Sequence, residues 1–398
     1  MLRDVVGTAA HPRLAASLER LGTETAFSVL ARAKELERQG RDVVHLEIGE
    51  PDFDTPSHVT EAAYAALRAG ETHYCPSAGI VELREAAAAE LSRTRDLDVS
   101  RERVLVGSGA KPFLFFTVLA VCDPGDEVVY PDPGFPIYES AIRFAGAVPV
   151  PLPLLEERDF TFDPDDLARR LSPRTKLVVL NSPQNPTGGV VPAGDLAEAA
   201  RAILETDAWV LSDEVYSRLL YEGEFASIAS LPGMLERTVV LDGLSKTYAM
   251  TGWRCGYAAV PEPLLDPLVR FIVNSTSCVP PFVQRAAVAA LTGPQDAPRA
   301  MVEELRRRRD VVVAGLNELP GVSCRVPRGA FYAFPNVSGV PLPADELAAR
   351  LLDEAGVALL AGSAFGRVGA RNLRVSYANS VENLERALDR LRLFLERL

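Results

Sequence analysis

Short apolar runs rich in β-branched residues alternate with longer stretches in which apolar residues recur at helical spacing. The short runs are bounded by turn residues and favour strands, whereas the longer stretches favour helices that pack on them. Strands are predicted at 103–107, 127–131, 176–181, 209–213, 238–242 and 254–260. Strands that alternate with helices in this way are typical of an α/β fold with a mainly parallel, helix-covered sheet.

Start and stop residues accompany the helical stretches. Ser57 precedes a run of helix formers that ends at Gly70, so we expect a capping serine and a terminating glycine there. After about residue 295 the pattern changes. The elements expected in that part are helices at 300–316 and from Val381, and short strands near 322–326 and 331–334. The predicted domains are a large one at 61–295 and a smaller α+β one at 296–398, to which the N-terminal segment 1–60 contributes.

Polar side chains follow several of the predicted strands at the point where each strand ends. In open parallel sheets, ligands bind beyond the carboxyl ends of the strands, because loops and helix N-termini converge there. The residues at these ends are Asn181, Asn185, Asp213, Tyr216, Ser245, Lys246 and the sequence G-S-G-A-K at 107–111. A carboxylate, a lysine, amides, hydroxyls and a glycine-rich helix start are therefore predicted along one rim.

Each of these features alone also has an ordinary structural explanation. G-S-G-A-K is either a simple turn between strand and helix or an anion site made by free backbone amides. It lacks the third glycine of a dinucleotide fingerprint. Asp213 alone fits a helix cap or an ion pair, and Lys246 alone fits a solvated surface side chain. N-P-T-G at 185–188 is by itself a good turn.

The charge balance favours a small-molecule partner. The chain has 42 lysines and arginines against 54 acidic residues, a net charge of −12, which argues against binding to nucleic acid or an anionic membrane. The apolar run at 113–122 is about half of the ~20 residues that a membrane-spanning helix needs. Asp4 interrupts an N-terminus without a continuous apolar stretch, so we expect no signal peptide and a cytoplasmic protein.

Cysteine and histidine spacing gives no indication of a metal site. The five cysteines include no C-x-x-C pair, and the four histidines include no H-x-x-x-H pair. Reduced thiols are therefore expected rather than disulfides or a zinc site.

One segment changes the interpretation of the strand ends. D-G-L-S-K-T-Y-A-M-T-G-W-R-C-G-Y at 242–257, together with N-P-T-G and S-D-E-V-Y, closely resembles the class I/II aminotransferases, the fold-type I family that uses pyridoxal 5′-phosphate. The likeness covers almost the whole chain, including E-I-G-E-P-D-F-D-T-P at 47–56, T-H-Y-C-P-S-A-G at 72–79 and N-L-R-V-S-Y-A at 372–378. The resemblance implies a large domain built on a mainly parallel seven-stranded sheet, with a smaller α+β domain beside it.

The resemblance also implies roles around the cofactor ring. Lys246 occupies the position of the lysine that holds the cofactor and moves the substrate proton. Asp213 matches the carboxylate that keeps the ring nitrogen protonated. Tyr216 and Asn185 match the hydrogen-bond donors to the phenolic oxygen of the ring, and Phe135 matches the aromatic residue that covers one ring face. A core phenylalanine is the alternative for Phe135.

The phosphate and the substrate are assigned to further residues through the same resemblance. The implied phosphate site consists of the helix start at Gly109, Ala110 and Lys111, the hydroxyl of Ser245, and Arg254. For Lys111 this prediction concerns the backbone amide, and its side chain is either solvated or involved. The implied substrate site consists of Arg374 for the α-carboxylate, the backbone of Gly49, Phe135 and Asn185. A structural ion pair is the alternative for Arg374.

Tyr74 resembles the tyrosine that reaches the phosphate of the neighbouring subunit's cofactor. The resemblance therefore implies a homodimer with shared active sites.

Three positions depart from the family pattern. Gly243 stands where many relatives have a hydroxyl, so one phosphate contact is expected to be missing or replaced by water. Phe135 stands where aspartate-specific members have tryptophan, which weakens the prediction of aspartate as donor. The segment 22–27 carries Glu24 and Thr25 and either tunes specificity or only starts a helix, of which the second is expected.

The predicted activity is the transfer of the amino group of an L-amino acid, with an aspartate-like donor favoured, to a 2-oxo acid such as 2-oxoglutarate. The alternative on the same fold is a lyase that eliminates a β or γ leaving group. A regulator that only senses ligand is a third possibility, but the chain has no basic N-terminal extension long enough for a DNA-binding module.

Overall fold

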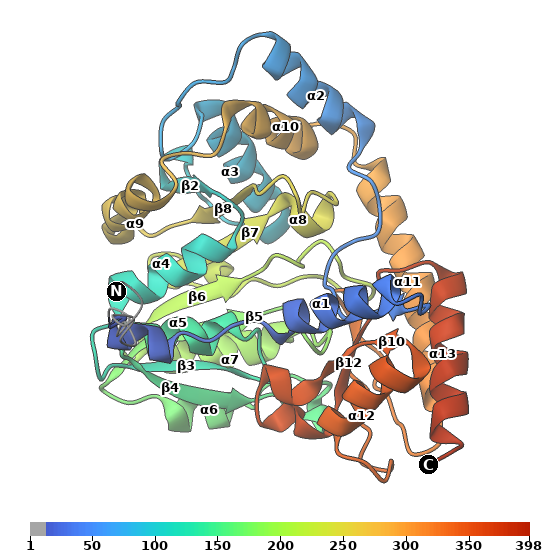
Figure 1. Ribbon diagram of the computed structural model, residues 1–398. Coiled ribbons are helices and arrows are strands. Elements are labelled where there is room, and N and C mark those ends of the chain that lie inside the picture. The colour runs from blue at the N-terminus through green and yellow to red at the C-terminus, as the bar shows by residue number, and fades with distance from the viewer. Residues whose placement is uncertain (1–12) are drawn as a thin grey trace, which may run out of the picture.

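A seven-stranded sheet forms the centre of the computed structural model, which describes residues 13–398 (Figure 1). The N-terminal stretch around Asp4, on which the signal-peptide expectation rests, lies outside the described residues. The strand order is β2-β8-β7-β6-β5-β3-β4, and β8 is antiparallel to both of its neighbours while the other pairs are parallel. The strands are β2 (Val104–Gly107), β3 (Glu127–Asp132), β4 (Val148–Pro153), β5 (Thr175–Asn181), β6 (Trp209–Asp213), β7 (Thr238–Gly243) and β8 (Gly256–Ala259). The resulting α/β fold confirms the predicted fold class.

Helices cover both faces of this sheet because successive residues of the buried strands point to opposite sides. In β5, Val178 packs with α6 and α7, whereas its neighbour Val179 packs with α4, α5 and α9. The helices around the sheet are α2 (Ser57–Arg68), α3 (Val81–Arg95), α4 (Lys111–Val121), α5 (Ile137–Ala145), α6 (Pro164–Arg170), α7 (Ala193–Leu204), α8 (Leu244–Thr247), α9 (Glu262–Ser275) and α10 (Pro281–Thr292). Burial on both faces of the sheet thus explains why the strand sequences are almost continuously apolar.

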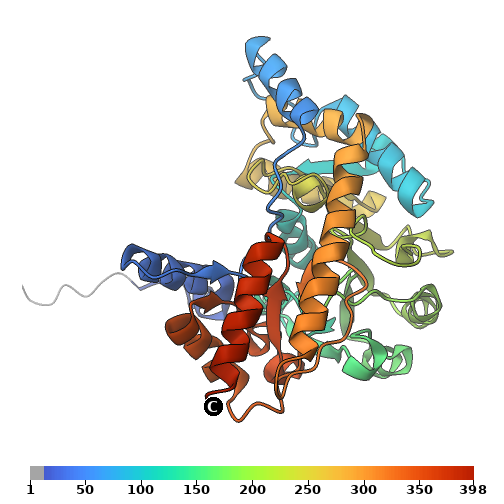
Figure 2. The same ribbon diagram turned by 90° about the vertical axis from the view of Figure 1, so that its right-hand side faces the viewer.

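Strands from the early and late parts of the described chain pair with each other beside the sheet. β1 (Val44–His45) pairs in parallel with β10 (Val357–Ala358), and Figure 2 shows the N-terminal helix next to the C-terminal elements. In the same region α11 (Asp296–Asn317) lies alongside α13 (Val381–Leu395). The remaining elements are α1 (Thr25–Arg38), α12 (Ala344–Arg350), β9 (Tyr332–Ala333), β11 (Leu360–Ala361) and β12 (Leu373–Ser376). The N-terminal segment and the C-terminal elements, far apart in sequence, are therefore neighbours in the fold.

Most predicted elements are confirmed, but two details of the sequence interpretation are wrong. At 322–326 there is only an isolated bridge between Ser323 and Asn336, because the side chain of Asn317 bonds the backbone N–H and C=O of Cys324 in place of a strand partner. Ser57 is not a cap: α2 begins at Ser57, and Pro56 precedes it without a side-chain capping bond. Gly70 ends that helix with a φ of +79°, as expected.

Within the part of the chain that the structure describes, no helix combines the length and the apolar character needed to cross a membrane.

Candidate active site

A cavity of about 710 Å³ opens at the carboxyl ends of β5, β6 and β7. The N-terminus of α4, the loop after β1 and strand β12 complete its walls. All the predicted site residues line this cavity except Gly109 and Tyr74: Gly49, Ala110, Lys111, Phe135, Asn185, Asp213, Tyr216, Ser245, Lys246, Arg254 and Arg374. The structure thus brings together residues that lie up to 325 positions apart in the sequence (374 − 49).

Lys246 enters the cavity from α8, the single helical turn that follows β7. Its Nζ atom donates a hydrogen bond to the carbonyl oxygen of Gly49. Burial lowers the pKa of the Lys246 amine to about 8, and Arg374 and Arg254 add to this effect. Roughly a tenth of this amine is therefore unprotonated at pH 7, far more than for an ordinary lysine, and the unprotonated form acts as nucleophile or base.

Asp213 is the last residue of β6 and is 8% exposed. Its Oδ2 atom accepts a 2.6 Å hydrogen bond from the Tyr138 hydroxyl, and Oδ1 accepts a 3.4 Å bond from the backbone of Val215. Burial raises the pKa of Asp213 to about 6, while the bond from Tyr138 opposes the rise. A cationic ring atom beside this carboxylate would stabilise its charged form.

Behind Asp213 lies a buried charge network. The guanidinium of Arg95 contacts Glu214 at 2.7 Å, Ser217 at 2.7 Å and Asp242. Glu214 and Asp242 both raise the pKa of Asp213 by like-charge repulsion. Because Arg95 neutralises these two neighbours, it limits their effect on Asp213.

The N-P-T-G turn is held against the sheet by Asn181, the last residue of β5. The Asn181 side chain donates to the carbonyl oxygen of Asp213 at 2.9 Å and accepts from the backbone N–H of Asn185 at 3.1 Å. The Asn185 side chain in turn accepts a 3.1 Å bond from Arg374. This turn therefore links the end of the sheet to β12.

Arg374 is 4% exposed and lies between two aromatic rings. Its guanidinium carbon is 4.6 Å from the ring centre of Tyr332 and 4.9 Å from that of Phe365. The guanidinium also donates to Asn185 and to the carbonyl oxygen of Glu47, but its buried Nε atom has no hydrogen-bond partner among residues 13–398. A fixed, incompletely satisfied guanidinium of this kind suits a carboxylate ligand.

The turn between β2 and α4 lies beside Arg254. Gly109 has a φ of +84°, and a Cβ atom at this position would collide with the Arg254 guanidinium. Arg254 itself donates to the backbone oxygens of Thr251 at 2.9 Å and Ser108 at 3.3 Å. With Ala110 capping α4 and Ser245 lining the same cavity, backbone amides, a hydroxyl and a guanidinium converge, which is typical of a phosphate site. The anion-site interpretation of G-S-G-A-K is thus favoured by geometry.

Two of the departures from the family pattern have a structural explanation. Gly243 is paired with Gly256 across β7 and β8, and a Cβ atom at Gly243 would lie only 3.3 Å from the Gly256 Cα. Glu24 precedes α1, which begins at Thr25, so the expected helix start is confirmed. The side chain of Glu24 makes no capping bond, however, and lines the cavity, where it pairs with Lys111.

Sequence reasoning missed three side chains of the site. Tyr138 stands in the sequence P-D-P-G-F-P-I-Y at 131–138, three residues after Phe135, and helical spacing could have found it. Tyr332 and Phe365 carry no local signal. The Tyr332 hydroxyl is 2.8 Å from that of Tyr216, and a side chain at Gly49 would occupy the position of this hydroxyl. Gly49 is thus required for close packing.

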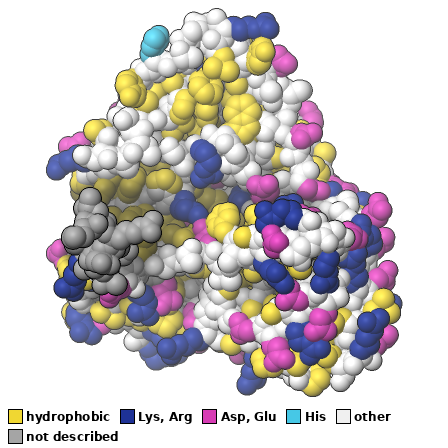
Figure 3. Space-filling view, in the orientation of Figure 1, with side chains coloured by type: hydrophobic (Ala, Val, Ile, Leu, Met, Phe, Trp, Pro, Cys, Tyr) yellow, Lys and Arg dark blue, Asp and Glu magenta, His cyan; other side chains and the backbone are white. Residues whose placement is uncertain are grey.

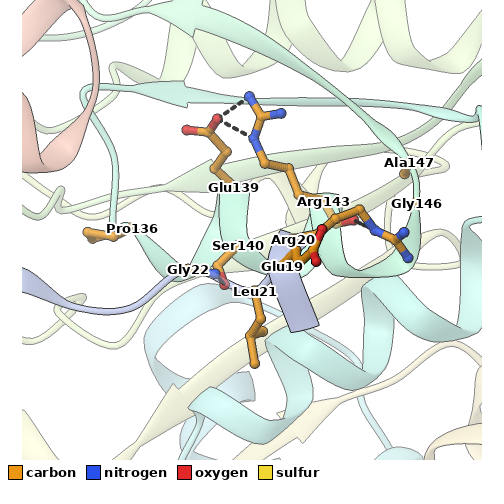
Figure 4. Close-up of a pocket in the computed structure, with 10 residues that line it drawn as sticks. All are labelled: Glu19, Arg20, Leu21, Gly22, Pro136, Glu139, Ser140, Arg143, Gly146 and Ala147. Carbon is orange, nitrogen blue, oxygen red and sulfur yellow. Dashed lines mark hydrogen bonds and ion pairs between the residues drawn. The ribbon is translucent and has the colours of Figure 1, made fainter. Parts of the chain in front are cut away.

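Tyr74 lies outside the cavity and is 89% exposed. A second, separate pocket lies where α5 meets the segment before α1 (Figure 4). Figure 4 shows Glu139 and Arg143 paired with each other along α5, and the backbone oxygen of Arg143 accepts from Arg20. None of the predicted site residues lines this second pocket.

The donor set of the first cavity fits pyridoxal phosphate. Within the described part of the chain, four cationic side chains line it, namely Lys111, Lys246, Arg254 and Arg374, and Phe135 offers an aromatic face. The amine of Lys246 and the carboxylate of Asp213 are the complementary groups for an aldehyde and a basic ring nitrogen. The unpartnered Nε of Arg374 leaves a donor for a bound anion.

Comparison with known proteins gives a consistent result. Residues 41–391 match the family described as aminotransferase class I and II. The aspartate/prephenate aminotransferase of Thermus thermophilus is 44% identical over 384 residues, 95% of this chain and 97% of that protein. The aromatic-amino-acid aminotransferase 2 of Thermococcus litoralis is 40% identical over 353 residues, 88% of this chain and 90% of that protein. The crystal structure of the aspartate aminotransferase from Rhizobium meliloti superposes with a TM-score of 0.92 at 37% identity, covering 97% of this chain and 100% of that one.

These relatives are named for amino transfer, so the comparisons do not favour the lyase alternative. Members of the matched family use pyridoxal phosphate, the group that the cavity fits. The chain therefore belongs to the class I and II aminotransferases, with fold type I, and is a pyridoxal-phosphate-dependent transaminase.

Proposed function

We propose that the enzyme transfers the amino group of an aspartate-like L-amino acid to a 2-oxo acid such as 2-oxoglutarate. The observation that carries this proposal is a single cavity that holds the amine of Lys246, the carboxylate of Asp213 and the buried guanidinium of Arg374. Relatives named for aspartate, prephenate and aromatic amino acids support an amino acid donor. Because their names differ in the substrate, the identity of the donor's side chain is a matter for experiment.

Lys246 has two roles in this proposal. Its amine holds the cofactor, and once the substrate has displaced it, the same amine moves the proton from the α-carbon. Bound pyridoxal phosphate supplies an electron-accepting ring. The pKa of about 8 for Lys246, lowered by burial, suits a base that must also be reprotonated near neutral pH.

Asp213 would keep the ring nitrogen cationic, because an ionised carboxylate beside that nitrogen stabilises its protonated form. Tyr216 and Asn185 would donate hydrogen bonds to the phenolic oxygen of the ring, and Phe135 would cover one ring face. Both donors are pre-positioned: the Tyr216 hydroxyl bonds that of Tyr332, and Asn181 anchors Asn185.

The phosphate is assigned to the amides of Gly109, Ala110 and Lys111, the Ser245 hydroxyl and Arg254. A guanidinium can make two charge-assisted bonds to one phosphate, and the N-terminus of α4 adds its dipole. These local positive groups explain how a chain with a net charge of −12 can bind an anion.

Arg374, with the backbone of Gly49, is assigned to the substrate α-carboxylate. The proposed division into 1–60, 61–295 and 296–398 places Arg374 and Lys246 in different domains. Pairing of β1 with β10 supports the inclusion of the N-terminal segment in the small domain. Substrate binding would then draw the domains together and exclude water from the proton-transfer step.

We further propose that the enzyme is a cytoplasmic homodimer in which Tyr74 reaches the phosphate site of the partner subunit. Tyr74 is 89% exposed in the single chain. Hydrophobic side chains gather around α2 and α10 on the face in Figure 3, and Tyr64 and Leu67 of α2 are 55% and 42% exposed. An exposed apolar surface of this kind is typical of a subunit interface.

Uptake of pyridoxal phosphate by the cofactor-free protein is expected to accelerate ~tenfold per pH unit up to about pH 8 and then to level off. The reason is that burial lowers the pKa of Lys246 to about 8, and only the unprotonated amine attacks an aldehyde. Stopped-flow absorbance of the cofactor after mixing gives the rate. A midpoint near the ordinary lysine value of ~10.4 contradicts this prediction.

The proposed activity is tested with a panel of single L-amino acids added to the holoenzyme. Conversion of the bound cofactor to its amine form is followed by visible absorbance, and Lys246→Ala is the blank. Aspartate is expected to convert the cofactor fastest, with one equivalent of 2-oxo acid formed per site. The proposal of an aspartate-like donor is wrong if aspartate converts the cofactor no faster than alanine. Catalytic release of ammonia without an acceptor would instead indicate a lyase.

A further inference from the structure

The ion pair between Glu24 and Lys111 lies inside the active-site cavity rather than on the outer surface. Glu24 is the residue immediately before α1, and Lys111 is the first residue of α4. The two side chains are 18% and 45% exposed, so water still reaches the pair. A pair that water still reaches adds little net stability and can open without a large cost.

Among the described residues that line the cavity, Lys111 is the cation whose side chain has no proposed role yet. Arg374 is assigned to the α-carboxylate, Arg254 to the phosphate and Lys246 to the cofactor. The Lys111 Nζ atom is 5.1 Å from the ring centre of Phe135, the residue proposed to cover the ring. An ammonium at this position is therefore available to a second negative group on the substrate, but Glu24 already neutralises it.

The charge of Glu24 also acts on other groups that line the cavity. Burial lowers the pKa of Arg374 and raises that of Tyr332, and the negative charge of Glu24 raises the pKa of both groups. A substrate that carries a second carboxylate must therefore displace Glu24 from Lys111 and bear its repulsion. A substrate with an uncharged or aromatic side chain neither displaces Glu24 nor is repelled by it. Such a side chain can pack beside Phe135 while the ion pair stays closed.

We propose that Glu24 is a specificity-determining residue: its carboxylate occupies Lys111 in place of the side-chain carboxylate of a dicarboxylic substrate, and so allows one pocket to accept both dicarboxylic and uncharged substrates. This inference rests on the proposed function, because it assumes that Arg374 and Lys246 orient the substrate in this cavity. The ion pair opens for a dicarboxylate and stays closed for an uncharged side chain.

The test measures binding to the holoenzyme by calorimetry, with maleate as the dicarboxylate and 3-phenylpropionate as the monocarboxylate. Glu24→Gln is expected to shift the ratio of the two dissociation constants about tenfold in favour of maleate, because Lys111 is then free. Glu139→Gln is the matched control. Glu139 also pairs with an arginine, but in the separate pocket of Figure 4, so this substitution is expected to leave the ratio unchanged.

A double-mutant cycle shows whether Glu24 acts through Lys111. In a Lys111→Met background, Glu24→Gln is expected to shift the ratio clearly less than in the parent, because only the repulsion by Glu24 is then relieved. The inference is overturned if Glu24→Gln leaves the ratio within about twofold of the parent, or if its effect is the same with and without Lys111.

Kinetics separate this inference from the proposed function. The ratio of kcat/KM for aspartate to that for phenylalanine is expected to rise about tenfold in Glu24→Gln. If the parent enzyme takes nitrogen from neither amino acid, the proposed function is wrong, while the binding ratios still decide the role of Glu24.

Discussion

Replacement of Lys246 with alanine is expected to lower the rate of amino transfer at least ~10⁴-fold. Two functions are lost together, because the same amine is proposed to hold the cofactor and to move the substrate proton. The rate is measured in single turnover with aspartate, so that slow product release does not hide the loss.

The control for this substitution is Lys34→Ala. Lys34 lies on α1, pairs with Glu37 outside the cavity and is expected to be replaceable without a change in rate. Thermal unfolding of both variants shows whether the fold is kept. If Lys246→Ala retains more than about one hundredth of the parent rate without an added amine, Lys246 is not the base.

The central sheet could be predicted from sequence because its strands are buried on both faces. Their apolar runs are almost continuous, and β6 was predicted with its observed bounds at 209–213. β4 was not predicted, because its sequence V-P-V-P-L-P alternates with proline, which cannot donate to a ladder. It lies at the sheet edge, where such residues are tolerated, and Val148 at its start is 43% exposed.

The residues of the site could be identified only where chemistry and a local motif coincide. Lys246, Asp213 and Asn185 each follow a strand within a short recognisable sequence, and the structure places all three in one cavity. Tyr332 and Phe365 lie in the C-terminal part, and only folding brings their rings against Arg374. No local pattern encodes that contact.

Electrostatic properties were equally inaccessible from sequence. The pKa of Lys246 falls and that of Asp213 rises because both groups are buried, and burial depends on the whole fold. The side chain of Glu24 was expected to do no more than accompany a helix start. Its pairing with Lys111 depends on the starts of α1 and α4 both reaching the cavity, although Glu24 and Lys111 are 87 positions apart in the sequence (111 − 24).

Asp213→Asn is expected to lower kcat about 10³-fold while the protein still binds pyridoxal phosphate. Asparagine has nearly the same shape as aspartate and can still accept the hydrogen bond from Tyr138, so the main change is the loss of one buried negative charge. Without that charge the ring nitrogen loses its proton more easily, and the α-proton of the substrate becomes harder to remove. The rate is measured with aspartate and 2-oxoglutarate, and cofactor retention by absorbance after gel filtration.

Tyr138→Phe separates the charge of Asp213 from its hydrogen bond. This variant keeps the carboxylate but removes the bond that lowers the pKa of Asp213, so that pKa should rise above about 6. Asp213 must be ionised to support the ring nitrogen, and the acid-side loss of activity should therefore move to higher pH, with less than a ~10-fold loss at the optimum.

A cofactor analogue methylated on the ring nitrogen carries a permanent positive charge and should restore much of the activity of Asp213→Asn. If the analogue restores none, Asp213 acts by positioning the ring and not by its charge.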